Sequence, residues 1–204
     1  MGLLSSSVAL MRYKVQGSLK EPMPDTVTEA LKQNAFTEIE DEAAEKTVGW
    51  TSFQSPFKPE FDGSSFMFGT YIVFSMRIDK KSIPSKLVKK NYTEEAAKKL
   101  AETQREYLSR NEKLAIREQV LNALSLRIPA IPSIYDAMWN YEAGMVWFFS
   151  TQKAANEEFE SLFSRSFKLA LIRLFPYTMA QFGCDLSESQ RDALNHLSPT
   201  RFAE

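Results

Sequence analysis

Hydrophobic and polar positions in the first part of the chain follow the patterns of strands joined by one short helix. The segment 7–15 alternates imperfectly and predicts a first strand. Asp25 stands where a residue can cap a helix that runs to Asn34. The segment 48–53 and the long run 66–78, rich in aromatic and β-branched residues, predict two further strands that pair with each other. The predicted order is therefore strand, helix, strand, strand.

A long helical pattern follows from Thr93 to Leu126, with no Gly or Pro inside it. Apolar residues recur every seven positions along one narrow stripe, at Leu100, Tyr107, Leu114 and Leu121. The remaining faces carry equal numbers of acidic and basic side chains. At 1.5 Å per residue, one continuous helix of this extent is about 50 Å long. The pattern predicts a single charged rod whose C-terminal end packs on the core.

The last part of the chain returns to short elements. Ile128-Pro-Ala-Ile-Pro132 ends the helix. The predicted elements after it are a hairpin of two strands, a helix and an apolar strand, over 134–141, 145–150, 153–168 and 169–179. Ser187 and Gln190 have the spacing of a capping box and predict a short helix in the tail.

Together these elements predict an α+β fold. It has two related halves, βαββ and ββαβ, which form antiparallel sheet and are joined by the long charged helix. The expected segments are an N-terminal half, the helix, a C-terminal half and a tail, over residues 1–92, 93–127, 128–180 and 181–204.

The distribution of charge along the chain, and not the total, is informative about function. The chain has 204 residues and a net charge of −1, so any binding of nucleic acid depends on segregated charge. Between residues 77 and 90, Asp79 is the only acid among six bases: Arg77, Lys80, Lys81, Lys86, Lys89 and Lys90. Such a cluster neutralises several phosphates and releases counterions, and the alternative is a solvated turn. Without a recognition-helix, zinc-finger or RNP-like pattern, we expect contacts to the DNA backbone with weak sequence preference.

The sequence contains no pattern typical of a disulfide, a cysteine-based zinc site, a nucleotide cofactor or a membrane span. One cysteine, Cys184, excludes a disulfide within the chain and a cysteine-based zinc cluster, and favours a reducing, cytoplasmic setting. His196, the one histidine, lies in a polar tail helix and reads as a surface residue. The glycines form no phosphate-binding loop, so no cofactor is predicted. No apolar run approaches the length of a membrane span.

Two rival functions remain open on the residues alone. Metal-dependent nucleases use clustered carboxylates close to a lysine. Glu60 and Asp62 precede a strand that ends in Asp79 and Lys80, which loosely fits that arrangement. The other rival is a scaffold protein that uses the exposed rod, with Leu108 on its stripe, as a dimer or partner helix.

An ordered series of short motifs resembles the RdgC family. It begins with Ala35-Phe36-Thr37 and Gly49-Trp50. The most telling part is Arg77-Ile-Asp-Lys-Lys-Ser-Ile-Pro-Ser85, which continues through Val88 and Lys89 into the charged helix. Gln119-Val-Leu, the proline-containing break and Met138-Trp139 follow, ahead of a Gly-Met-Val-Trp-Phe strand. No single motif is specific; their order and spacing across residues 30–180 carry the resemblance.

The resemblance implies a non-enzymatic, nucleoid-associated homodimer. RdgC proteins close into a ring that holds double-stranded DNA without sequence preference, and they restrain the RecA recombinase by occupying DNA. Arg77, Lys81 and Lys89 match basic family positions and become the first candidates for phosphate contacts. Charge clustering adds Lys80, Lys86 and Lys90 to these candidates, and Arg127 beside the proline break completes the set.

Two departures from the family pattern change the expected assembly. This chain ends where longer members continue into a region that helps to close the ring. Ile128-Pro129 stands where those members carry an aromatic residue implicated in DNA engagement. We therefore expect an open dimer or a different oligomer.

Overall fold

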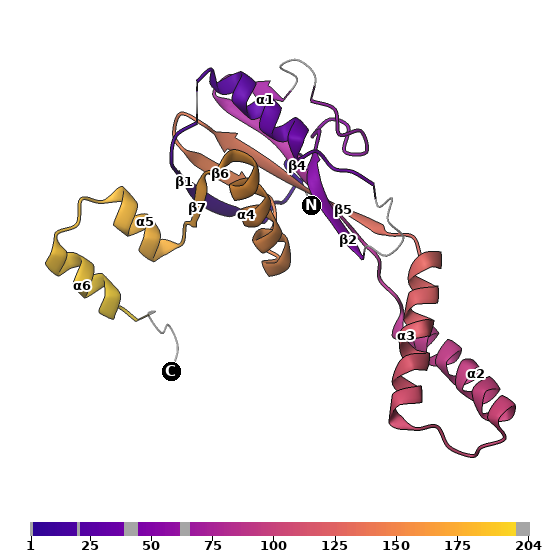
Figure 1. Ribbon diagram of the computed structural model, residues 1–204. Helices are drawn as coiled ribbons and strands as arrows, with labels where there is room; N and C mark the ends of the chain where they lie inside the picture. Colours follow the sequence, from indigo (N-terminus) through magenta and orange to yellow (C-terminus); the bar gives the residue numbers. More distant parts are fainter. Residues whose placement is uncertain (1, 20, 39–44, 62–65, 199–204) are drawn as a thin grey trace.

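The computed structural model describes residues 2–19, 21–38, 45–61 and 66–198. In this part of the chain, two helices cover one face of a curled antiparallel sheet, and a helical hairpin and a C-terminal arm extend from it (Figure 1). The strands are β1 (Met11–Gln16), β2 (Lys46–Thr51), β3 (Met67–Phe68), β4 (Tyr71–Lys80), β5 (Ile131–Asn140), β6 (Met145–Phe148) and β7 (Ala170–Arg173). The helices are α1 (Met23–Gln33), α2 (Ser85–Thr103), α3 (Arg110–Arg127), α4 (Lys153–Phe167), α5 (Pro176–Gly183) and α6 (Glu188–His196).

The sheet has the strand order β2-β4-β5-β6-β1-β7, with β3 paired to β4. The predicted pairing of the second strand with the long third strand is confirmed, since Val48 lies opposite Ile78 in an antiparallel ladder. The predicted hairpin of β5 and β6 is also confirmed. β1 lies between β6 and β7, so strands of both predicted halves share one sheet. The α+β class is therefore correct, while the relation between the two halves stays a prediction.

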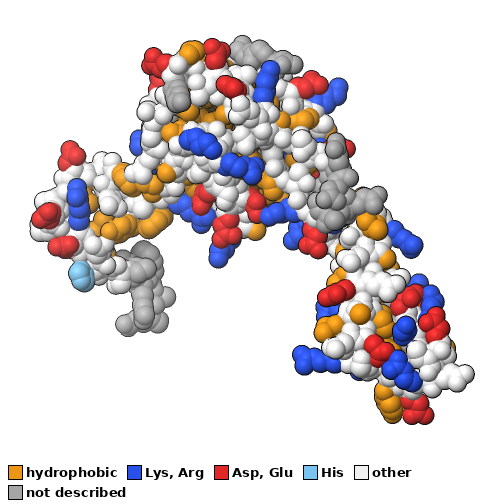
Figure 2. Space-filling model, in the orientation of Figure 1, with side chains coloured by type: hydrophobic (Ala, Val, Ile, Leu, Met, Phe, Trp, Pro, Cys, Tyr) orange, Lys and Arg blue, Asp and Glu red, His pale blue; other side chains and the backbone are white. Residues whose placement is uncertain are grey.

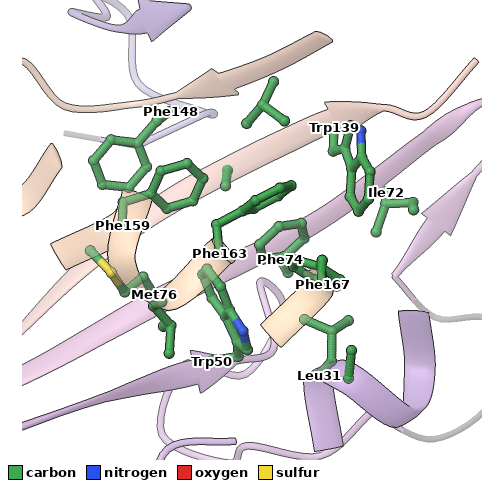
Figure 3. Packing of buried hydrophobic residues seen from close by; sticks show 14 of the residues in the cluster. Leu31, Trp50, Ile72, Phe74, Met76, Trp139, Phe148, Phe159, Phe163 and Phe167 are labelled. Carbon is green, nitrogen blue, oxygen red and sulfur yellow. The ribbon is translucent and has the colours of Figure 1, made fainter. Parts of the chain in front are cut away.

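Aromatic side chains fill the core between the sheet and α4 (Figure 3). Phe159 of α4 is fully buried and stacks on Phe148 of β6 with ring centroids 4.2 Å apart. Trp50 of β2 meets Phe74 of β4 edge to face at 5.0 Å. The Trp50 Nε1–H donates a 2.8 Å hydrogen bond to Ser166 Oγ. Such ring pairs add about 0.5–1.5 kcal/mol beyond the area that they bury.

Gly49 explains why two separate motifs belong together. A Cβ atom on Gly49 would lie 2.4 Å from the Cα atom of Phe36, which is a collision with backbone. Because the two backbones approach closely, the segment after α1 forms backbone hydrogen bonds with β2. The Phe36 N–H donates to the Trp50 carbonyl at 2.7 Å, and the Trp50 N–H donates to the Asn34 carbonyl at 2.9 Å. Ala35-Phe36 and Gly49-Trp50 therefore form one packing unit.

The predicted single rod is wrong, because the structure contains two helices in its place. α2 ends at Thr103, where Gln104 adopts a left-handed conformation with φ of 46°. α3 begins after Ser109, whose side chain and that of Glu112 form a capping box. The spacing of Ser109 and Glu112 was the signal for a new helix inside the periodic pattern.

The reversal lets apolar side chains of the two helices cover one another. Ile116, Val120 and Leu124 of α3 are buried in a small cluster that includes Val88 of α2 and Leu108 of the connecting loop. On a straight rod these side chains would remain in water, so burial favours the hairpin. Two residues of the predicted stripe, Tyr107 and Leu114, stay 81 % and 51 % exposed. Leu108 is only 9 % exposed inside this cluster. It is therefore not available as the exposed partner contact that the scaffold hypothesis assigned to it.

The hairpin of α2 and α3 is an insertion between paired strands. β4 and β5 pair along their whole length, from Tyr71 opposite Asn140 to Lys80 opposite Ile131. The helices leave this end of the ladder and project away from the sheet (Figure 1). Because its apolar cluster is separate from the main core, the hairpin is stabilised mainly by its own packing.

The C-terminal segment differs from the predicted strand over 169–179. β7 ends at Arg173, and α5 begins at Pro176, a residue that suits the first turn of a helix. The predicted tail helix is confirmed as α6, with its Ser187 and Gln190 capping box. α5 and α6 have no buried residue, and apolar side chains remain exposed along this arm (Figure 2).

Glu112 makes the hairpin sensitive to acid. Its carboxylate accepts the Ser109 N–H at 2.9 Å and the Arg105 Nη2–H at 2.5 Å. The backbone bond from Ser109, followed by that from Arg105, lowers the pKa of Glu112 from 4.5 to about 2. A carboxyl group with a lowered pKa in the folded state stabilises that state above its unfolded pKa. This contribution is lost as the pH falls from 4.5 to about 2.

We therefore expect Glu112→Gln to flatten the acid dependence of helix stability. Circular dichroism in urea, measured at a series of pH values from neutral to about 2, compares the variant with the wild type. The difference between them should shrink across the titration window of Glu112. Parallel curves at every pH would contradict the assigned role of this carboxylate.

Candidate nucleic-acid interface

The seven residues predicted to contact DNA fall in different places. Lys80 is exposed at the end of β4. Arg77, Lys81 and Arg127 line a pocket of about 510 Å³ where the hairpin joins the sheet. Lys86, Lys89 and Lys90 lie together on exposed positions of α2. The structure therefore divides the predicted cluster between the base of the hairpin and the hairpin itself.

Arg77 has an intramolecular partner. Arg77 and Asp79 are two residues apart on β4 and so project from the same face of the sheet. The Arg77 Nε–H and Nη2–H donate to the two Asp79 carboxylate oxygens at 2.7 and 2.6 Å. The guanidinium also lies 4.1 Å from the centre of the Phe36 ring. The hydrogen bond to Asp79 raises the pKa of Arg77, and the two side chains form a buried salt bridge.

The pocket at the base of the hairpin has mixed charge. Besides Arg77, Lys81 and Arg127, it is lined by the carboxylates of Glu38 and Asp79. Because acids stand beside the bases, the local potential for an anion is weakened. The predicted phosphate contacts of Arg77, Lys81 and Arg127 stay predictions, and this pocket is not the strongest candidate.

A groove between α2 and α3 collects basic side chains without acids. Its volume is about 620 Å³, and Lys89 lines it from α2 opposite Arg110, Lys113 and Arg117 of α3. No acidic residue lines it. All four basic side chains are exposed, and none of them forms an ion pair within the described part of the chain. The groove is therefore a local site of positive charge on a nearly neutral protein.

Three acidic residues of the same helices pair with bases outside the groove. Glu94 pairs with Lys90 at 3.9 Å, and Glu95 pairs with Lys98 at 2.6 Å. Glu112 is held by Arg105. On the face shown in Figure 2, basic and acidic side chains are intermixed. Acidic and basic residues are equal in number between residues 93 and 126, but only basic ones line the groove.

Sequence reasoning found Lys89 but missed its three companions. Arg110, Lys113 and Arg117 counted as solvated charges of a balanced rod. Their spacing of three and four residues does place them on one helical face. Their position opposite Lys89 depends on the reversal between the helices. That reversal became visible only with the capping box at Ser109.

The residues of the metal-nuclease hypothesis do not form a recognisable site. Asp62 lies outside the described residues. Asp79 is bound to Arg77. Among the residues that the structure describes, no three His, Cys, Asp or Glu side chains are placed to hold a metal ion. Within the same ranges, no helix combines the length and the apolar character that crossing a membrane requires.

Comparison with known families supports the resemblance in the motifs. A family model described as "Putative exonuclease, RdgC" matches residues 9–181, which includes the sheet, both helices of the hairpin and most of α5. A search of the curated proteins finds no match. The family match extends across most of the 204 residues, so it covers the whole framework that positions the groove. The chain belongs to the RdgC family.

Proposed function

We propose that this protein binds DNA through phosphate contacts along the α2–α3 hairpin, without sequence preference. The observation that carries this proposal is the groove with four unpaired basic side chains and no acidic lining residue. Membership of the RdgC family supports the same ligand. We infer in addition a non-enzymatic, nucleoid-associated homodimer that limits access of RecA to DNA, as the family resemblance implies.

The spacing of the bases on α3 suits a DNA strand. Arg110 and Arg117 are seven residues apart on one helix, which is about 10 Å along its axis. Phosphates of one strand of a duplex follow each other at about 3.4 Å along the axis, so about three of them span the same distance. Lys89 faces this row from α2, and Lys86 and Lys90 extend the basic surface along that helix.

Binding of this kind depends steeply on salt. Four phosphate contacts predict a slope of about −4 in a plot of log affinity against log salt concentration for duplex DNA. Raising the salt fourfold should then weaken binding about a hundredfold. Fluorescence anisotropy on several unrelated duplexes should give similar affinities and the same slope.

We expect the double variant Lys89→Gln/Lys113→Gln to reduce the magnitude of that slope by about two, on every duplex. The matched control is Lys98→Gln/Lys153→Gln, which removes two exposed lysines that already have glutamate partners. The control should keep the slope of the wild type. Equal slopes for the two double variants, or no binding by the wild type at low salt, would overturn the proposed interface.

The description of the matching family as an exonuclease gives a second candidate function a specific basis. End-labelled duplex, incubated with Mg²⁺ or Mn²⁺ under conditions of full binding, separates binding from cleavage. Our proposal requires the DNA to keep its full length. Metal-dependent shortening that disappears in Asp62→Ala would establish the nuclease instead.

A further inference from the structure

The groove between α2 and α3 has an apolar lining that phosphate contacts do not use. Ile83, Val88, Tyr92, Leu114 and Leu121 line it together with the four bases and Ser85. Leu114 is 51 % exposed there, although it is a large aliphatic side chain. Ile83, Val88 and Tyr92 are half-buried members of the hairpin's apolar cluster, whereas the basic side chains are exposed. The groove therefore has an apolar floor and a basic rim.

This combination distinguishes between the forms of DNA. A duplex presents phosphates and sugars outward and keeps the faces of its bases stacked inside, so it leaves an apolar floor in contact with water. An unpaired strand exposes base faces, which stack on aromatic rings and pack on apolar side chains beside a positively charged track. A volume of about 620 Å³ is also within the range of about 300–1,000 Å³ that holds a small organic group such as a nucleotide.

We propose that the groove holds the bases of an unpaired DNA strand. Tyr92 and Leu114 contact base faces, while Lys89, Lys113 and Arg117 contact the flanking phosphates. Every base has an apolar face, so this contact carries little sequence preference. The inference rests on the proposed function, and it specifies that the groove binds single-stranded DNA.

Three DNA probes of equal length test the site by fluorescence anisotropy. They are an unstructured oligothymidine, an abasic oligonucleotide with the same phosphates and no bases, and a duplex. Stacking of one base on an aromatic side chain changes affinity by about fivefold to a hundredfold. We therefore expect the wild type to bind the oligothymidine at least fivefold more tightly than the abasic strand, on the scale of one such base contact.

Two variants remove the floor without removing charge. Leu114→Ser replaces an exposed apolar side chain, and Tyr92→Leu keeps an apolar residue in the hairpin cluster while removing the ring. Both should lower affinity for oligothymidine towards that of the abasic strand, and leave duplex binding and its salt slope unchanged. The matched control is Leu126→Ser, since Leu126 is 56 % exposed on the same helix but outside the groove. It should behave as the wild type.

The possible failures separate this inference from the function on which it rests. Equal affinity for oligothymidine and the abasic strand, with normal salt dependence, would overturn base binding and leave backbone binding intact. An equal loss on all three probes in the floor variants would also overturn it, since the variants would then act through the fold. Absence of binding to every probe would overturn both proposals.

Discussion

Arg77→Ala is expected to lower the free energy of unfolding by about 3–5 kcal/mol, the cost of removing one partner from a buried ion pair. The side chains of Arg77 and Asp79 are 8 % and 9 % exposed, and the two hydrogen bonds between them are short. Alanine would leave the Asp79 carboxylate buried without its partner. It would also remove the guanidinium from the face of the Phe36 ring, a contact worth about 0.5–2 kcal/mol.

Urea denaturation followed by circular dichroism measures this loss. Lys80→Ala is the matched control, because Lys80 is an exposed base on the same strand. A double variant, Arg77→Met/Asp79→Leu, removes both charges and should recover much of the stability. A loss in Arg77→Ala no greater than that in Lys80→Ala would contradict the structural role of the pair.

The result bears directly on how DNA-binding data for Arg77 are interpreted. Arg77 matches a basic family position and was a first candidate for a phosphate contact. Because the same side chain stabilises the sheet beside the hairpin, lower DNA affinity in Arg77→Ala has a second explanation. Lys89→Gln avoids this ambiguity, since Lys89 is exposed and has no ion pair in the described part of the chain.

Phe159→Ala is expected to lower the free energy of unfolding by about 3–5 kcal/mol, through the lost burial and the cavity that remains. The Phe159 ring is fully buried where α4 meets the sheet, and it contacts Phe148 of β6 and Trp50 of β2 (Figure 3). A smaller side chain would lose the contacts that join α4 to both β6 and β2. Close packing in the core leaves little room for neighbours to relax into the space.

Phe68→Ala provides the matched control for this measurement. Phe68 is 50 % exposed on β3, so its truncation should cost well under half as much in urea denaturation. Near-ultraviolet circular dichroism should also change in Phe159→Ala, because the packing of several aromatic rings depends on it. Similar losses in the two variants would show that Phe159 is not central to the core.

The architecture explains how one small chain keeps a stable frame and an accessible site. The sheet core and the hairpin cluster are separate, so the groove can carry exposed apolar and basic groups without weakening the main core. The hairpin is attached by the long ladder between β4 and β5, which holds both of its ends. A site on such an insertion is presented away from the body (Figure 1).

Elements whose signals are local could be predicted from the amino-acid sequence. Imperfect alternation identified β1, runs of aromatic and β-branched residues identified β2 and β4, and helical periodicity identified α1 and α4. Each of these patterns depends only on residues within its own element. The capping box of Ser187 and Gln190 identified α6, because its hydrogen bonds join residues three positions apart. The motif series identified the family, since order and spacing are properties of the chain alone.

The tertiary structure was needed to find the features that depend on distant residues. It replaced the predicted rod with two helices, because Ile116, Val120 and Leu124 are buried only when the chain folds back on itself. It paired Arg77 with Asp79 in a buried site, although a count of charges treats both as free. It brought Arg110, Lys113 and Arg117 opposite Lys89, across a reversal that no charge count can detect. Local patterns specify which elements form, whereas long-range packing specifies which side chains meet.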